Sequence, residues 1–294
     1  MIDYKGKIIV IAGPTASGKS DIAIRLAKDI NGYIINGDSR QVYKGLDIGT
    51  AKPVFDERVA KGEYILDGVR HFLFDYIDPK DSYTLYDYQL DVNRILSKQK
   101  GIPILTGGTG LYIDSIVFNY NLVKNSTHRD DLENMSINEL HSIAGDILNS
   151  MNESDRGNRH RLIRAIERGG VNKQRGKSLN HIYFILDIDK EKLKQRVLER
   201  VENMFCSGLL EENISLIKNG YTYDDKGMRS IGYIEFKEYF EDNISLEDVK
   251  QKIYTNTLSY IKRQRTWFKR NRQSIWTDSY KEILYKASNF ILNE

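Results

Sequence analysis

Residues 7–20 read KIIVIAGPTASGKS, and this stretch decides the fold. Its first six residues are a β-branched apolar run, which predicts a strand buried in a parallel sheet. Residues 13–20 match the pattern G-x-x-x-x-G-K-[ST] at every fixed position. The apolar residues that follow recur at helical spacing and are Ile22, Ala23, Leu26, Ala27 and Ile30. A strand, this loop and a helix in that order form a phosphate-binding loop.

This loop favours an anion for simple electrostatic reasons. Its glycines let backbone N–H groups converge on one anion, and the following helix adds the partial positive charge of its N-terminus. Lys19 supplies a full positive charge, and the hydroxyl of Ser20 can hold Mg²⁺. The motif predicts a polyphosphate ligand with Mg²⁺ as cofactor, but it leaves open which polyphosphate is bound and whether a phosphoryl group is transferred.

Strand and helix patterns alternate through the first half of the chain. Further strands are predicted at residues 33–35, 71–74, 102–105, 182–187 and 274–276, and a helix at 83–98. This alternation predicts an α/β fold with a P-loop NTPase-like core, in which helices flank a parallel sheet. Residues 121–180 carry polar helical patterns instead. We therefore expect a catalytic core formed by residues 1–120 and 181–294, with an all-helical insertion domain at 121–180.

Composition narrows the class of protein. The 294 residues include 44 Lys and Arg against 41 Asp and Glu, for a formal net charge of +3. No apolar run approaches the ~18 residues of a membrane span, and no secretory signal is recognisable, so we expect a cytoplasmic protein that does not enter a membrane. The single cysteine, Cys206, excludes a disulfide framework and a Cys-rich zinc module, and we expect it in the core. The five histidines show no pair at metal-ligand spacing.

Two further loops follow predicted strands. Asp38 comes after the strand at 33–35, and Thr109 lies in a Gly-rich turn after the strand at 102–105. Because the carboxyl ends of parallel strands meet at one edge of the sheet, we expect both residues beside the phosphate loop. The glycines of the second loop would let a ligand approach the backbone closely. Alternatively, Asp38 is a helix cap or turn carboxylate and the glycines form an ordinary tight turn.

Two segments are strongly basic. The first carries Arg156, Arg159, Arg161, Arg164, Arg168, Lys173 and Arg175. The second, residues 249–277, contains no Asp or Glu and interleaves its Lys and Arg residues with aromatic residues. Such a pattern suits contact with phosphates and stacking on bases, and it predicts a surface that binds RNA. The alternative is a solvated helix in which Trp267 and Phe268 belong to the core.

Seven motifs occur in order along the chain, at residues 13–20, 38–43, 45–53, 107–112, 158–167, 229–233 and 262–268. The second and third read DSRQVY and GLDIGTAKP, and the last two read RSIGY and KRQRTWF. Together they resemble the bacterial tRNA dimethylallyltransferase family, the tRNA isopentenyltransferases. The resemblance implies an enzyme that transfers a dimethylallyl group from dimethylallyl diphosphate to N6 of the adenosine immediately 3′ of the anticodon, position 37, and releases diphosphate. The phosphate loop would then hold the diphosphate and not ATP, tRNA would be the partner, and we expect a monomer.

The resemblance also assigns roles by position. Asp38 resembles the general base, and Thr109 matches a threonine near the reacting groups. The residues that would bind the substrate diphosphate are Gly13, Pro14, Thr15, Ala16, Ser17, Gly18, Lys19 and Ser20. The residues that would bind tRNA are Asp38, Ser39, Arg40, Gln41, Thr109, Arg129, His160, Arg161, Leu162, Ile163 and Arg164.

Transfer of a dimethylallyl group to adenine N6 requires a base for the proton and cations for the leaving diphosphate. Adenine N6 is a poor nucleophile because its lone pair is delocalised, so a carboxylate such as Asp38 must take its proton. The departing diphosphate needs cations, which Lys19, the loop N–H groups and Mg²⁺ near Ser20 would provide. Arg229, or the i, i+4 pair Arg196 and Arg200, would close over it. Alternatively, the latter pair forms surface ion pairs with Glu199 or Glu202.

Two other functions use the same phosphate loop. A nucleotide or small-metabolite kinase would bind ATP there, but it leaves the basic C-terminal segment unexplained. An ATP-gated RNA-binding module without transfer chemistry would explain that segment, but its activity would not need Asp38.

Overall fold

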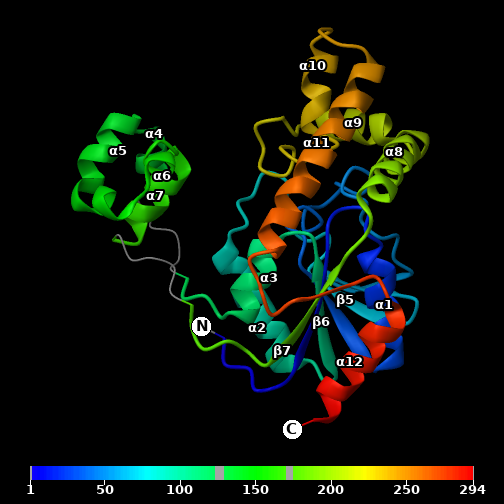
Figure 1. Ribbon diagram of the computed structural model, residues 1–294. Coiled ribbons are helices and arrows are strands. Elements are labelled where there is room, and N and C mark those ends of the chain that lie inside the picture. Colours follow the sequence, from blue (N-terminus) through cyan, green and yellow to red (C-terminus); the bar gives the residue numbers. More distant parts are fainter. Residues whose placement is uncertain (1, 123–128, 170–174, 294) are drawn as a thin grey trace. The chain divides into compact units, whose positions relative to one another are not determined.

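The computed structural model describes residues 2–122, 129–169 and 175–293 (Figure 1). They divide into two compact units, one formed by Ile2–Val117 with Leu179–Glu294 and the other by Phe118–Ser178. The first unit contains the sheet, and the second is built from short helices. The second unit occupies nearly the same stretch as the helical insertion expected at 121–180.

One sheet of eight strands organises the first unit, in the order β3-β4-β5-β2-β6-β1-β7-β8. The strands are β1 (Ile8–Ala12), β2 (Gly32–Asn36), β3 (Glu57–Ala60), β4 (Glu63–Leu66), β5 (Val69–Phe72), β6 (Ile102–Gly107), β7 (His181–Leu186) and β8 (Ile275–Thr277). Strands β5, β2, β6, β1, β7 and β8 run parallel to one another. Strands β4 and β3 add an antiparallel edge beside β5. The predicted α/β class with a mainly parallel sheet is confirmed.

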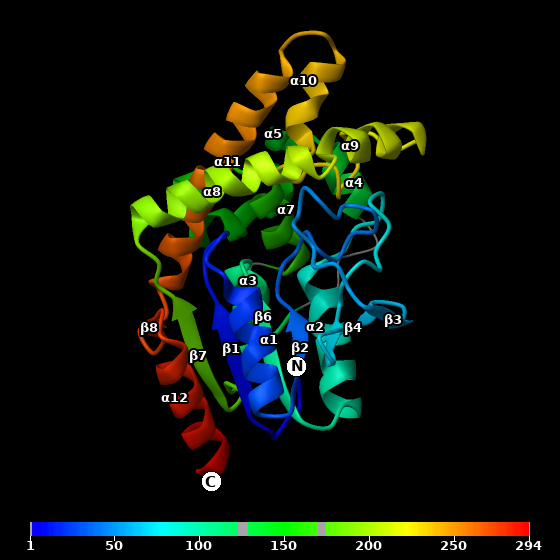
Figure 2. The same cartoon turned by 90° about the vertical axis from the view of Figure 1, so that its right-hand side faces the viewer.

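Helices pack on both faces of this sheet and beyond the ends of its strands (Figure 1 and Figure 2). They are α1 (Lys19–Asp29), α2 (Leu85–Lys98), α3 (Gly110–Val117), α8 (Lys190–Cys206), α9 (Leu209–Lys218), η2 (Ile234–Phe236), α10 (Lys237–Phe240), α11 (Leu246–Phe268) and α12 (Tyr280–Leu292). Helices α1 and α12 lie on one face and α2 and α3 on the other (Figure 1). Helix α8 runs across the ends of the strands and packs on α11, where a second apolar core forms (Figure 2). Within the described ranges, no helix is both long and apolar enough to cross a membrane.

Some local expectations were wrong. The strand predicted at 71–74 ends at Phe72, because Leu73 adopts a left-handed backbone with φ 67°. The hairpin of β3 and β4 was not predicted, since β3 is exposed throughout and carries no apolar pattern. Cys206, expected in the core, is exposed at the last turn of α8. The helix predicted at 83–98 begins at Leu85, where the Thr84 side chain caps it.

The second unit has its own small core. Its elements are α4 (Arg129–Asn134), α5 (Ile137–Ala144), η1 (Gly145–Ser150), α6 (Glu153–Arg156) and α7 (Arg159–Glu167). Capping side chains start three of the helices: Ser136 caps α5, Asn152 caps α6 and Asn158 caps α7. The buried residues between them are Leu132, Leu140, Ala144, Leu162 and Ile163.

Candidate active site

The phosphate loop connects β1 to α1 through a sharp turn. The Ser17 N–H donates to the Pro14 carbonyl at 3.2 Å, and both Ala16 and Gly18 have left-handed backbones, with φ of 64° and 84°. A side chain at position 18 would therefore be strained. The turn delivers Lys19 to the start of α1, and its Nζ donates to the Pro14 carbonyl at 3.4 Å.

Two more loops leave the sheet at the same edge, as the sequence predicts. Strand β6 lies between β2 and β1, so the loops that follow these three strands are neighbours. The Thr109 N–H donates to the Gly37 carbonyl at 3.1 Å, and the Thr109 hydroxyl accepts from the Ser39 N–H at 3.0 Å. These bonds join the loop after β6 to the loop after β2.

Asp38 occupies a tightly held turn. Its N–H donates to Asn36 Oδ1 at 2.8 Å, and Asn36 Nδ2 donates to the Asp38 carbonyl at 3.1 Å. Asp38 Oδ1 accepts from the Arg40 N–H at 2.9 Å. The carboxylate thus closes a turn, as one alternative predicts, and it also lines a pocket.

At this edge of the sheet, the charges of Asp38 and Arg200 both affect the pKa of Lys19. Burial lowers the pKa of Lys19 to about 8; the charge of Asp38 opposes this shift and the charge of Arg200 adds to it. Burial also lowers the pKa of Arg200, again against the effect of Asp38. Lys19 and Arg200 are therefore cations that have lost part of their hydration and lie near the same carboxylate.

The arginines of α8 bind loops of the sheet edge. Arg196 Nη1 donates to the carbonyl groups of Ala16 and Ser17 in the phosphate loop, at 3.4 and 3.3 Å. Arg200 Nη2 donates to the Thr50 carbonyl at 3.4 Å. Arg196 therefore holds the loop itself, whereas Arg200 lines the pocket.

The acidic residues proposed as alternative partners of these arginines bind elsewhere. Glu199 accepts from Gln195 Nε2 at 3.0 Å, and Glu202 pairs with Lys250 at 3.0 Å. The surface-pairing alternative is therefore wrong for both.

Helix α11 contributes two residues that were not predicted for the site. Gln264 Oε1 accepts from the Thr15 N–H, and its Nε2 donates to the Gly108 carbonyl, both at 2.9 Å. Tyr260, one turn earlier on the same helix, lines the pocket beside Thr109. Burial raises the pKa of Tyr260 to about 12, and the charge of Asp38 acts in the same direction, so this hydroxyl stays protonated at neutral pH.

The sequence contains a periodic pattern for the face of α11 that contacts the site. Ile253, Thr257, Tyr260 and Gln264 are spaced by three or four residues and so lie on one face of α11. The first three line the pocket.

These elements enclose a pocket of about 370 Å³. Its polar lining includes Thr15, Asp38, Ser39, Arg40, Thr109, Arg200, Arg229 and Arg263. Its apolar lining includes Val201, Met204, Ile231 and Ile253. Of the predicted catalytic set, Asp38, Thr109 and Arg229 thus share one cavity, while Lys19 and Ser20 lie at the start of α1 outside that lining.

The glycines of the turn after β6 serve packing, which corrects the expectation that a ligand approaches them. A Cβ at Gly108 would lie 2.3 Å from Gln264 Nε2, and one at Gly110 would lie 2.2 Å from Trp267 Cδ1. Helix α11 therefore occupies the space that the missing side chains leave.

A family model described as IPP transferase matches residues 41–271. The chain belongs to the IPP transferase family. A tRNA dimethylallyltransferase of Bacillus mycoides is 36% identical over 293 residues, which cover 92% of this chain and 90% of the relative.

Solved structures resemble this IPP transferase along nearly its whole length. The tRNA isopentenylpyrophosphate transferase of Bacillus halodurans is 31% identical with a TM-score of 0.73, and the alignment covers 98% of this chain and 97% of the other. The corresponding enzyme of Staphylococcus epidermidis is 31% identical with a TM-score of 0.71, covering 98% and 99%. A eukaryotic dimethylallyltransferase acting on tRNA is 25% identical with a TM-score of 0.78, covering 98% and 80%.

Part of the segment after β2, which was assigned to tRNA binding, lines the pocket in this IPP transferase. Ser39 and Arg40 line the pocket, and Arg40 also donates to the Lys226 carbonyl at 3.2 Å. The Gln41 side-chain amide instead donates to the carbonyl groups of Thr50 and Ala51, at 3.2 and 3.0 Å.

The predicted tRNA segment of the second unit needs a correction. Leu162 and Ile163 are buried in its core, at 0% and 2% exposure, so their side chains lie out of reach of RNA. His160 and Arg161 are exposed on the same helix. Arg129 and Arg164 pair with Glu167 at 3.0 and 2.6 Å.

Several arginines of the first basic segment bind groups within the second unit itself, contrary to the expectation that the segment forms a surface for RNA. Arg156 donates to carbonyl groups of η1 and the residue after it, and Arg159 donates to those at the end of α4. Arg161 pairs with Asp155. Lys173 lies outside the described residues.

In the second basic segment, the alternative interpretation holds for Trp267 and Phe268, whereas several of the cations lie on the surface. Phe268 is buried, and Trp267 donates its indole N–H to Asp114 at 2.8 Å, so both aromatic residues belong to the packing. Several cations on the same helix and just beyond it stay exposed: Lys262, Arg263, Lys269, Arg270 and Arg272.

Proposed function

We propose that this IPP transferase transfers the dimethylallyl group of dimethylallyl diphosphate to N6 of adenosine 37 in tRNA and releases diphosphate. The observation that carries the proposal is the shared pocket, which brings Asp38 together with Thr15 of the phosphate loop and with Arg200. A base and an anion site in one cavity are what a transfer from a diphosphate to a weak nucleophile needs. The names of the bacterial relatives support the same reaction.

Asp38 acts as the general base. The C–N6 bond forms as the allylic C–O bond breaks, and the carboxylate takes the N6 proton. Because Oδ1 accepts the Arg40 N–H, we assign the proton to Oδ2. The bonds from Asn36 fix the backbone of Asp38, so the carboxylate needs little reorganisation during the reaction.

Cations around the pocket neutralise the departing diphosphate. Lys19, Arg200 and Arg229 supply the charges, and the amides at the start of α1 supply oriented dipoles. Mg²⁺ fits the oxygen donors present, because this ion binds through few protein ligands and takes its others from phosphate oxygens and water. Ser20, with an exposed hydroxyl in the first turn of α1, is the residue that would hold it. The ion would neutralise charge on the leaving group.

The apolar part of the pocket receives the hydrocarbon. Val201 and Met204 from α8 and Ile253 from α11 line this part of the pocket, and all three belong to the second apolar core. A five-carbon group buried there is kept from water, which would otherwise capture the activated allylic carbon.

RNA binds through exposed cations near the pocket. Arg263 lines it, and Lys269, Arg270 and Arg272 extend the charge beyond the end of α11. In the second unit, His160 and Arg161 are the exposed members of the assigned tRNA segment. An anticodon loop is already single-stranded, so moving one adenine into a pocket costs little unstacking energy. We propose that the enzyme acts as a monomer.

A two-label experiment tests this function. The protein is incubated with unmodified tRNA, Mg²⁺ and either dimethylallyl diphosphate labelled in its carbon chain or ATP labelled at its γ-phosphate. We expect the carbon label in RNA at adenosine 37 and no label from ATP. Phosphate label in RNA, or hydrolysis of ATP without transfer of the carbon label, would contradict the proposal in favour of a kinase or an ATP-gated module.

A further inference from the structure

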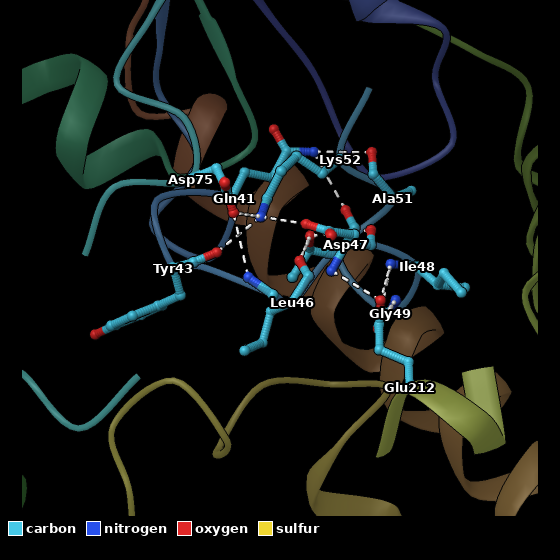
Figure 3. A network of polar contacts seen from close by, with 12 residues as sticks. Gln41, Tyr43, Leu46, Asp47, Ile48, Gly49, Ala51, Lys52, Asp75 and Glu212 are labelled. Atoms are coloured by element: carbon cyan, nitrogen blue, oxygen red, sulfur yellow. Dashed lines mark hydrogen bonds and ion pairs between the residues drawn. The ribbon is translucent and has the colours of Figure 1, made fainter. Parts of the chain in front are cut away.

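The loop 45–52, between β2 and β3, carries a motif to which the proposed reaction assigns no role. Gly49 and Thr50 line the pocket, and the Thr50 carbonyl accepts from Arg200 at 3.4 Å. The position of this carbonyl therefore bears on where the Arg200 guanidinium lies. Figure 3 shows the contacts that hold the loop.

One carboxylate gathers the backbone of the loop. Glu212, on α9, accepts from the N–H groups of three consecutive residues: Asp47 at 3.2 Å, Ile48 at 3.0 Å and Gly49 at 3.4 Å (Figure 3). Hydrogen bonds to a charged acceptor are roughly twice as strong as those between neutral groups. Helix α9 itself contributes no residue to the pocket lining among the described residues, so Glu212 acts on the site through the groups that it binds.

A buried tyrosine completes this contact. The Tyr233 hydroxyl donates to Glu212 Oε1 at 2.6 Å and accepts from the Gly49 N–H at 3.1 Å. Tyr233 is fully buried, and burial and the charge of Glu212 raise its pKa, so the hydroxyl keeps its proton. A Cβ at Gly232 would lie 2.9 Å from the Gly49 Cα, so the loop 229–233, which carries Arg229, lies directly against this one.

The other end of the loop is fixed independently. Lys52, only 4% exposed in its side chain, binds the Tyr43 carbonyl at 2.8 Å and pairs with Asp47 at 2.5 Å and Asp75 at 2.7 Å. Gln41 Nε2 donates to the Thr50 carbonyl at 3.2 Å. The loop around the Thr50 carbonyl thus has two anchors, Lys52 and Gln41 at one end and Glu212 of α9 at the other.

We propose that Glu212 is a positioning residue for diphosphate binding: by holding the N–H groups of residues 47–49, it places the Thr50 carbonyl that orients Arg200 in the pocket. The inference rests on the proposed function, since it assigns Arg200 to the diphosphate. A glutamine at position 212 keeps the shape of the side chain but replaces one accepting oxygen with an NH₂ group that faces backbone N–H groups, so the anchor of the loop is weakened.

Binding of inorganic diphosphate in the presence of Mg²⁺, measured by calorimetry on the full chain, tests the inference. We expect E212Q to weaken this binding about tenfold, and Y233F to weaken it roughly threefold. E211Q, which removes the same charge from the exposed neighbour on α9, is the matched control and should bind like the wild type. In an R200A background, E212Q should change the affinity by less than about twofold, because the residue through which it acts is gone.

The outcomes separate the two proposals. If the wild type binds no diphosphate, the proposed function fails and the inference with it. If the wild type binds but E212Q binds equally well, or if the losses of E212Q and R200A are additive, the inference alone is overturned. Thermal unfolding of each variant shows whether it folds, and Y233F, which removes a single oxygen, provides the same test should E212Q not fold.

Discussion

Gln264 accepts a hydrogen bond from the Thr15 N–H at 2.9 Å, across 249 residues of sequence. The same side chain donates to the Gly108 carbonyl and is 4% exposed. One amide group therefore ties the phosphate loop to the turn that carries Thr109. Helix α11, with its exposed cations, is thereby fixed to the phosphate loop, so that these cations and the loop keep one relative geometry.

Replacing Gln264 tests how much its side-chain amide contributes to the free energy of unfolding. Gln264→Leu leaves the partly buried Thr15 N–H and the buried Gly108 carbonyl without this partner, so we expect the free energy of unfolding to fall by about 1–3 kcal/mol. Urea denaturation measures this loss. Gln273→Leu, at an exposed position, is the control and should change stability by less than about 0.5 kcal/mol. Equal stability of the two variants would show that the bridge contributes nothing.

Asp38→Asn tests the general base. The amide preserves the size of the side chain but cannot take the N6 proton at neutral pH, so single-turnover transfer should slow by about 10²–10⁴-fold. The affinity for tRNA should stay within about threefold of the wild type, because no phosphate contact is lost. Asp278→Asn, at an exposed position, controls for the loss of one charge. Transfer at near wild-type rate by Asp38→Asn would refute the assignment.

The lowered pKa of Lys19 predicts a pH dependence. The group is a cation below its pKa of about 8 and loses its charge as the pH rises through that value. We therefore expect kcat/KM for dimethylallyl diphosphate to fall above about pH 8, since this ratio reports the free enzyme. An arginine stays charged throughout this range, so Lys19→Arg should remove the decline even if its overall rate is lower. A decline of the same shape in both proteins would assign it to another group.

Gly110→Ala tests the packing of α11 on the turn after β6. The added Cβ would lie 2.2 Å from Trp267 Cδ1, and the indole is held by its hydrogen bond to Asp114. We expect the overlap to cost about 1–3 kcal/mol of unfolding free energy. Gly157→Ala is the matched control, since its nearest neighbour would be 3.8 Å away. Denaturation curves that coincide for the two variants would contradict the packing role.

The exposed cations beyond α11 predict the salt dependence of tRNA binding. Each phosphate contact contributes roughly 0.7–0.9 to the slope of log K against log salt concentration, so K269Q/R270Q should reduce that slope by about 1.5. Lys252→Gln is the control, because Lys252 of α11 pairs with Glu238 of α10 at 2.6 Å. Slopes that do not differ between the double variant and the wild type would exclude these two residues from the RNA contact.

The sequence by itself determined the phosphate loop, the mainly parallel sheet and the meeting of Asp38 and Thr109 at one edge. Each follows from a local pattern: a strand that ends in a Gly-rich turn, a helix with one apolar face, and polar residues directly after a strand. Such patterns act over a few residues and survive in any packing of the chain. This is why six strands were located from the sequence, whereas the exposed strand β3 and its short partner β4 were missed.

The tertiary structure alone decided which distant groups meet. The sequence around Thr15 does not predict its hydrogen bond with Gln264, and the sequence around Gly49 does not predict its hydrogen bond with Glu212. These contacts depend on how α9 and α11 pack across the sheet edge. Burial is also a property of the packed chain: Leu162 and Ile163 lie in a basic segment that reads as an RNA surface, yet they form a core. Local sequence sets the periodicity of a helix, but the residues it touches are set by the summed packing of all the elements around it.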